Sequence, residues 1–172
     1  MLALIHSGDL RLMQRLNRWQ APRWVRVWML AATRGGDGWL WAAAGFAILL
    51  LGGPNRYRAA GVASVVALLA ALLFLTLKRL AVRKRPCHVQ PHCWATLLPP
   101  DRFSFPSGHT LMAFALAGSI AAFYPDISPM LYFCAYSIGL SRVLLGMHFL
   151  SDVIAGAVLG WWLAACVAPL LS

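Results

Sequence analysis

Long apolar stretches separated by short polar segments make up most of the chain. Residues 59–77 hold nineteen consecutive positions without a charge, and residues 153–172 hold twenty more. A helix that crosses a bilayer needs about 20 mainly apolar residues, because every backbone amide in hydrocarbon must be hydrogen-bonded within the segment. Three further stretches approach this length, with Trp, Tyr, Gly or small polar residues at their ends: 38–53, about 107–124 and about 128–146. The pattern therefore predicts five membrane-spanning helices.

The N-terminal part of the chain follows a different pattern. Residues 24–32 are apolar but too short to cross a bilayer alone. The segment before them places apolar and basic residues on opposite sides of a predicted helix, with Leu10, Met13 and Leu16 on one side and Arg11, Arg15 and Arg18 on the other. Such a helix is typical of the headgroup region beside anionic lipid. We therefore expect an amphipathic interfacial helix, followed by five spans, or six if residues 24–32 insert.

Alternating crossings assign each connector to one side of the membrane. The short connectors at 54–58 and 125–128 fall on one face, as tight helical hairpins should. The long connector at 79–105 falls on the other face, together with the adjoining ends of its neighbouring spans; we call this the active face. The connector holds most of the polar residues of the central chain, which indicates a structured, substrate-facing loop.

Composition and charge agree with a membrane protein. Hydrophobic residues make up 60% of the chain and charged residues 12%, far from the values of soluble domains. We expect one all-α domain over residues 1–172, with an interfacial segment at 1–37 and a transmembrane core at 38–172. The formal net charge is +10, but no nucleic-acid motif is present, so no nucleic acid is expected as a partner. The expected partners are the bilayer and a phosphorylated lipid; the sequence indicates no oligomeric state.

Three polar clusters fall on the active face. They read KRLAVRKRP from Lys78 to Pro86, PSGH from Pro106 to His109, and SRVLLGMHFLSD from Ser141 to Asp152. The first cluster can be simply a basic stop at a helix end. Lys78 and Arg85 are seven positions apart, so both project from one face if the helix continues.

The PSGH cluster fits two compatible interpretations. Ser107 can be the N-cap of a helix. A helix start also presents free backbone N–H groups that bind phosphate, and Gly108 lets the backbone approach closely.

In the third cluster His148 and Asp152 are spaced i, i+4, so on one helix they share a face. There a carboxylate can accept a hydrogen bond from the ring and fix its tautomer. The pair can be purely structural, but ionisable groups beside apolar spans are costly and are therefore candidates for function. Arg142 is six residues before His148, which is not one face of a straight helix, and Gly146 offers a place to break it.

Together the clusters supply cations, two histidines and a carboxylate. This set matches phosphoryl transfer through a covalent intermediate, in which a neutral histidine attacks phosphorus and a second histidine protonates the leaving oxygen. No metal or other cofactor is expected, because the chain has no Glu and its five Asp residues do not cluster along the sequence. Arg and Lys must then neutralise the developing charge.

In order and spacing, the three clusters resemble the signature of the type-2 phosphatidic acid phosphatase superfamily, which includes bacterial lipid phosphatases and is related to vanadium haloperoxidases. The matching motifs are Lys78-x6-Arg85-Pro86, Pro106-Ser107-Gly108-His109 and Ser141-Arg142-x5-His148-x3-Asp152. Each motif alone is weak, but three in sequence on one predicted face are specific. The resemblance covers residues 78–152 directly, and the flanking spans fit the family's helical core.

The resemblance implies a role for each matching residue. The expected catalytic residues are the nucleophile His148, its orienting partner Asp152 and the general acid His109. The expected phosphate-binding residues are Lys78, Arg85, Ser107, Gly108 and Arg142. The resemblance also implies metal-free hydrolysis and a site outside the cytoplasm of a bacterial plasma membrane. The positive-inside rule alone would place this basic face in the cytosol; we follow the resemblance because the site itself needs those charges.

The long connector also contains Cys87-His88-x3-His92-Cys93. These are four potential zinc ligands, but their spacing is not that of a common zinc finger. A Cys87–Cys93 disulfide is the favoured interpretation if the loop is periplasmic, since that compartment permits one.

Other functions share part of this inventory. A transporter or lipid-binding protein would hold a phosphate without cleaving it, but binding alone needs no acid and no nucleophile. Transfer of the phosphoryl group to a second lipid shares the first half-reaction with hydrolysis. Small members of the superfamily act on polyprenyl pyrophosphate, phosphatidylglycerophosphate, phosphatidic acid or lipid A phosphates. We favour undecaprenyl pyrophosphate, because a site between helices at the membrane surface suits a long isoprenoid chain.

Overall fold

Helices account for nearly all of the backbone in the computed structural model, which describes residues 2–89 and 103–171. Their order is α1 Leu2–Arg18, α2 Arg23–Arg34, the π-helical turn η1 Gly35–Trp39, α3 Leu40–Leu51, the 3-10 turn η2 Gly53–Asn55, α4 Arg56–Leu80, α5 Pro86–Val89, α6 Gly108–Ala121, the 3-10 turn η3 Pro125–Ile127, α7 Ser128–Leu144 and α8 Leu150–Leu171. Within the described ranges the only extended pairing is one bridge between Lys84 and Phe103. The predicted all-α membrane bundle is therefore confirmed.

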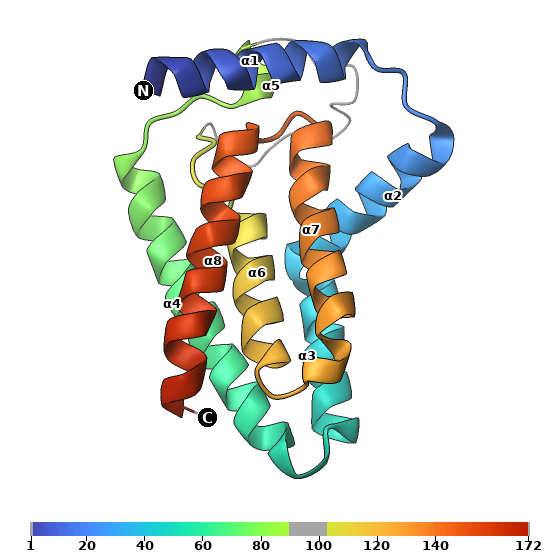
Figure 1. Cartoon of the computed structure of the whole chain (residues 1–172), viewed down its shortest axis with the longest axis vertical. Coiled ribbons are helices and arrows are strands. Elements are labelled where there is room, and N and C mark those ends of the chain that lie inside the picture. Colours follow the sequence, from blue (N-terminus) through green and yellow to red (C-terminus); the bar gives the residue numbers. More distant parts are fainter. Residues whose placement is uncertain (1, 90–102, 172) are drawn as a thin grey trace.

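The centre of the bundle is α6, with α4, α7 and α8 around it (Figure 1). α6 and α8 lie very close because α8 presents glycines to α6. A Cβ atom on Gly160 would lie 2.2 Å from the Leu111 carbonyl oxygen, and one on Gly156 would lie 2.7 Å from the Ser107 carbonyl oxygen. This Gly-x-x-x-Gly spacing is typical of close helix packing in membranes. It fixes the start of α6 against the start of α8.

Among the described residues, three helical stretches are long and apolar enough to cross a membrane: Gly53–Leu80, Pro125–Leu144 and Leu150–Leu171. The first contains the predicted span at 59–77, and the other two overlap the predicted spans at about 128–146 and 153–172. Large side chains such as Leu68 and Leu72 on α4 and Val158 on α8 are exposed, as expected for surfaces that lipid covers. The other two predicted spans correspond to shorter helices: α6 has 14 residues and α3 has 12.

Residues 24–32 form most of α2, which packs against α7. Trp28 of α2 stacks on Phe133 of α7 with ring centroids 5.9 Å apart. α2 runs into α3 through η1 without a loop, and the chain bends at Gly38, whose φ of 116° favours glycine. Residues 24–32 thus belong to a helix that continues through η1 into α3, within the first predicted span.

α1 lies across one end of the bundle, over the α7–α8 turn and the end of α4 (Figure 1). Met13 is buried against Phe149 and Val153, whereas Arg11, Arg15 and Arg18 are exposed. The predicted amphipathic helix is confirmed, and its contact with headgroups stays a prediction. The short turns η2 and η3 lie at the opposite end of the bundle, as the alternating crossings predicted.

Candidate active site

The helix α4 ends within the first motif, between Lys78 and Arg85. α4 stops at Leu80, and Ala81 has an extended backbone with φ of −104° and ψ of 98°. We call residues 81–85 the extended segment; it leads from α4 across the end of the bundle. The conditional expectation that Lys78 and Arg85 share a helical face is therefore wrong. Both nevertheless line the same pocket, because the extended segment carries Arg85 back over it.

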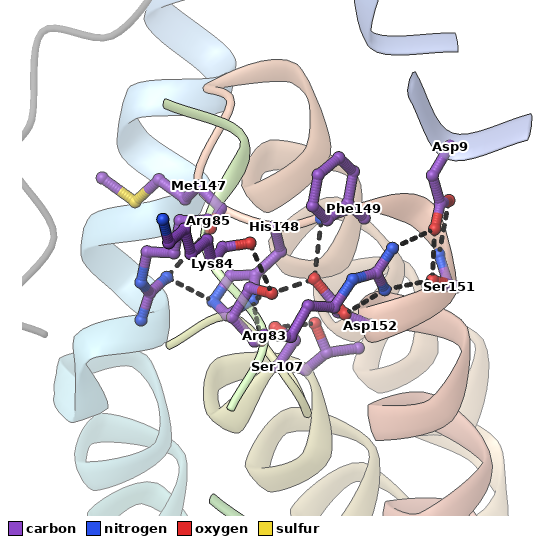
Figure 2. Close-up of polar contacts among 12 residues, drawn as sticks. Asp9, Arg83, Lys84, Arg85, Ser107, Met147, His148, Phe149, Ser151 and Asp152 are labelled. Carbon is purple, nitrogen blue, oxygen red and sulfur yellow. Dashed lines mark hydrogen bonds and ion pairs between the residues drawn. The ribbon is translucent and has the colours of Figure 1, made fainter. Parts of the chain in front are cut away.

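Side chains alternate along the extended segment, as in a strand. Arg85 is buried and Arg83 is partly buried, whereas Lys84 between them is exposed. Arg83 Nη1 donates to Asp152 Oδ1 at 2.7 Å, and Arg85 Nη1 lies 2.9 Å from His148 Nε2 (Figure 2). The segment thus places one guanidinium on Asp152 and one on His148, both from the third motif.

His148 lies in the turn between α7 and α8. Gly146 makes this turn with a φ of 67°, a conformation that glycine adopts without strain. The amides of Met147 and His148 both donate to the Arg142 carbonyl, at 3.0 and 3.1 Å. The expected break at Gly146 is confirmed. The expectation that His148 and Asp152 share one helix is wrong, because α8 begins only at Leu150.

The neighbours of the His148 ring determine its tautomer. The Ser104 carbonyl lies 2.6 Å from Nδ1 and can only accept, so Nδ1 carries the hydrogen. Arg85 can only donate, so Nε2 offers its lone pair. Burial lowers the pKa of His148 to about 4, with a contribution from the positive charges of Arg85 and Arg142. The ring is therefore neutral at pH 7, with the lone pair of Nε2 beside a cation.

Asp152 is fully buried in the first turn of α8. Its Oδ2 accepts the Phe149 amide at 2.8 Å, and its Oδ1 accepts Arg83. The distance from Oδ2 to His148 Nδ1 is 3.8 Å, within ion-pair range but too long for a hydrogen bond. The Ser104 carbonyl therefore orients the ring, and Asp152 acts on it through its charge.

Ser107 precedes α6 and is fully buried. It stands at the N-cap position, but its hydroxyl makes no capping hydrogen bond and pairs with the Thr110 hydroxyl at 2.9 Å. Its amide donates to the Asp152 carbonyl at 3.1 Å. A Cβ atom on Gly108 would meet the Phe74 ring at 2.8 Å. The PSGH motif thus joins α6 to α8 and α4, and only Gly108 and His109 of it reach the pocket.

His109 has a partner that the sequence interpretation missed. Its Nε2 lies 2.8 Å from Oδ1 of Asp37, which comes from the π-helical turn η1. Gly36 lets this turn approach, since a Cβ atom there would lie 3.1 Å from the His109 ring and 2.9 Å from Ile138. An acidic residue between glycines at the start of a span was the available signal for this contact.

Arg142 comes from the last turn of α7 and is buried. Its guanidinium donates to the hydroxyl of Thr33 on α2. This contact fixes the direction of the long Arg142 side chain, which then faces the same pocket as the two histidines.

The pocket itself has a volume of about 560 Å³ and lies between α4, η1 and α6. Its polar end holds Lys78, Arg85, Arg142, Asp37, His109 and His148. Its apolar wall consists of Ala70, Ala71, Phe74, Leu75 and Met112. Three cations and a neutral imidazole beside an apolar wall suit an anionic headgroup with a hydrocarbon tail. Ser107 and Asp152 do not line the pocket; they are buried next to residues that do.

Residues 58–171 match the family model of the PAP2 superfamily. The chain belongs to this superfamily. The PAP2 match covers most of the bundle and all three motifs, and it confirms the resemblance drawn from Lys78, His148 and the residues between them.

Several PAP2 relatives are similar over different shares of the chain. The decaprenylphosphoryl-5-phosphoribose phosphatase of Mycobacterium tuberculosis is 36% identical over 152 residues, 83% of this chain and 80% of that protein. The lipid A 1-phosphatase of Rhizobium etli is 34% identical over 103 residues, 58% of this chain but only 44% of that protein. The chain thus spans less than half of the second relative.

Solved PAP2 structures have the same fold. The phosphatidylglycerolphosphate phosphatase of Bacillus subtilis superposes with a TM-score of 0.77 and 28% identity, covering 97% of this chain and 86% of that one. The LpxE structure of Aquifex aeolicus gives a TM-score of 0.78 at 24% identity, covering 93% and 94%. The second likeness concerns the fold alone.

Two further expectations fall on the long connector. The possible Cys87–Cys93 disulfide and the alternative zinc site both need residues 92 and 93, which lie outside the described residues. Within residues 2–89 and 103–171, no three His, Cys, Asp or Glu side chains are grouped as metal ligands would be.

Proposed function

We propose that this protein hydrolyses a lipid phosphate or pyrophosphate through a phosphohistidine on Nε2 of His148. The observation that carries the proposal is the lone pair of Nε2, which faces Arg85 at 2.9 Å in a pocket that also holds His109. A phosphate that enters this pocket takes over the Arg85 N–H and leaves Nε2 free to attack. The lipid phosphatase names of the relatives support the same chemistry.

The first half-reaction forms the N–P bond and breaks the bond from phosphorus to the leaving oxygen. The phosphate-binding residues of this proposal are Lys78, Arg85 and Arg142, with the Gly108 amide at the start of α6, whereas Ser107 lies behind them and does not reach the pocket. They neutralise the charge that develops on the phosphoryl oxygens, which is the role a metal has in other phosphatases. The proton of His109 goes to the leaving oxygen.

The second half-reaction returns the enzyme to its starting state. Water attacks phosphorus and gives a proton to His109, and the N–P bond breaks with its electron pair returning to Nε2. In the intermediate the His148 ring carries a positive charge. The Asp152 carboxylate, 3.8 Å from Nδ1, stabilises that charge without accepting the Nδ1 proton.

The proposed substrate is a polyprenyl lipid, with undecaprenyl pyrophosphate preferred over phosphatidylglycerophosphate, phosphatidic acid and lipid A phosphates. The long match to a decaprenylphosphoryl-5-phosphoribose phosphatase supports this preference. The apolar wall of Ala70, Ala71 and Leu75 offers a path for one hydrocarbon chain from the membrane to the cations. The proposed location is a bacterial plasma membrane, with the pocket on the extracytoplasmic face.

A panel of purified lipid phosphates and pyrophosphates, assayed in detergent for released phosphate, tests the proposal. The wild-type protein should release phosphate and His148→Ala should not, whereas Lys84→Gln, on an exposed neighbouring cation, should behave as wild type. A quench in alkaline detergent, in which a phosphohistidine is stable, should trap label from a labelled substrate on the wild-type and Lys84→Gln chains but not on His148→Ala. Full turnover by folded His148→Ala would refute the nucleophile. Substrate binding without turnover would favour a lipid-binding protein, and label recovered on a second lipid would favour a phosphotransferase.

A further inference from the structure

A chain of charged contacts joins α1 to the active site (Figure 2). Asp9 is the one acidic residue of α1, and it lies on the apolar side of the helix, one turn before Met13. It is only 6% exposed. Its Oδ2 accepts Arg83 Nη2 at 2.7 Å and the Ser151 hydroxyl at 2.5 Å, and its Oδ1 accepts the Ser151 amide at 3.2 Å. Packing alone does not require a carboxylate on this side of an amphipathic helix.

Arg83 connects two carboxylates from opposite ends of the chain. One nitrogen binds Asp9, and the other donates to Asp152 Oδ1 and to the Ser151 hydroxyl, both at 2.7 Å. The guanidinium also lies over the Phe149 ring, 4.2 Å from its centroid. Planar, forked geometry of this kind is specific to arginine, because a lysine ammonium has a single nitrogen and no plane that can stack on a ring.

The position of Asp152 depends on these contacts. A buried carboxylate is costly unless charged or hydrogen-bonding partners surround it. Here the Phe149 amide holds Oδ2 and Arg83 holds Oδ1. Arg83 is itself 23% exposed, and without Asp9 its long side chain is free to turn toward water. Asp9 therefore fixes Arg83, and Arg83 fixes Asp152 beside the His148 ring.

We propose that Arg83 and Asp9 are positioning residues of this active site, acting through Asp152, so that the N-terminal helix is part of the catalytic support. Arg83 occupies a position that the Lys78-x6-Arg85 motif leaves unspecified, and neither residue lines the pocket. The proposal rests on the proposed hydrolysis through His148.

Four variants test this inference in the full chain in detergent: Asp9→Asn, Arg83→Lys, Arg83→Gln and the control Lys84→Gln. Misplacement of a catalytic group by about 1 Å costs about 100-fold in rate. We expect kcat to fall about 100-fold in Arg83→Gln and about 10-fold in Asp9→Asn, with KM within about twofold of wild type. Arg83→Lys should recover part of the loss, and Lys84→Gln should lose nothing. A purely structural role would lower only the folded fraction, which thermal melting measures, and kcat per folded molecule would then stay at the wild-type value.

The double variant Asp9→Asn/Arg83→Gln separates a shared path from two independent effects. Because Asp9 acts through Arg83, the double variant should be no slower than Arg83→Gln alone. If the kcat losses of the two single variants multiply in the double variant, or if both single variants keep wild-type kcat, the inference is overturned while the proposed hydrolysis stands. A wild-type protein without turnover, or a fully active His148→Ala, would instead overturn the proposed function and this inference with it. If Arg83→Gln does not fold, Arg83→Lys and its double variant with Asp9→Asn carry the same comparison.

Discussion

Gly156→Ala tests whether the close approach of α6 and α8 positions the active site. The added methyl group would lie 2.7 Å from the Ser107 carbonyl oxygen and 3.2 Å from the Leu111 amide nitrogen. Both atoms belong to backbone, so neither can turn aside as a flexible side chain would. The two helices must separate by several tenths of an ångström, and overpacking of this kind costs about 1–3 kcal/mol.

The same separation strains the contact between the Ser107 amide and the Asp152 carbonyl, which is 3.1 Å long. Asp152 and the start of α6 then move apart, so turnover should fall about 10-fold as catalytic groups lose their alignment. Gly61→Ala is the matched control, because a Cβ atom at that α4 position has no atom within 4 Å. Alanine there should only favour the helix, by up to about 1 kcal/mol.

Thermal unfolding in one detergent, followed by phosphate release at a fixed temperature, measures both effects. For a chain of this length a loss of 1 kcal/mol lowers the midpoint by about 2–4 °C. Gly156→Ala should therefore melt several degrees below wild type, and Gly61→Ala at or above it. If the two variants melt together and turn over substrate equally, the Ser107 contact does not hold the two helices in register.

Three further predictions concern individual side chains. Burial lowers the pKa of His148 to about 4 from an ordinary 6.5, so the ring should be about nine-tenths neutral at pH 5 and become protonated only as the pH falls through 4. Imidazole ¹⁵N NMR of the free protein, assigned with His148→Ala, measures this titration. A midpoint near pH 6.5 would contradict the burial argument. Asp37→Asn should slow the hydrolysis of alkyl phosphates about 10-fold but that of p-nitrophenyl phosphate far less, because a good leaving group needs little help from an acid. Equal losses of rate on both substrates would show that Asp37 does not act through proton transfer from His109. Intact mass without reduction should show Cys87 and Cys93 joined, and two free thiols would refute the disulfide.

The sequence was informative wherever the signal is local. Apolar length determined the helices that span the membrane, since each such helix must satisfy its own backbone hydrogen bonds. The amphipathic spacing of Met13 with its basic neighbours determined α1. The three motifs identified the superfamily and all six candidate residues that line the pocket, because their spacing in the chain is itself the signal.

Local rules failed where the chain leaves its helices. A seven-residue spacing in a basic run gives no sign that α4 ends at Leu80. The prediction that Lys78 and Arg85 share a helical face was therefore wrong, although both residues reach the pocket. An i, i+4 spacing likewise gives no sign that α8 begins two residues after His148. At the end of α4, tertiary contacts from Phe103 and Ser104 determine the backbone, whereas before α8 the amides of residues 147 and 148 turn back onto the Arg142 carbonyl after Gly146.

What the sequence determined, then, was which residues carry the chemistry, and what the tertiary structure decided was how each is held. Asp9 meets Arg83 across 74 residues, Asp37 meets His109 across 72, and Ser104 meets His148 across 44. No spacing rule connects positions so far apart, because such contacts exist only after the helices have packed. The unexpected acid on the apolar side of α1 was visible in the sequence, but its partner was visible only in the fold.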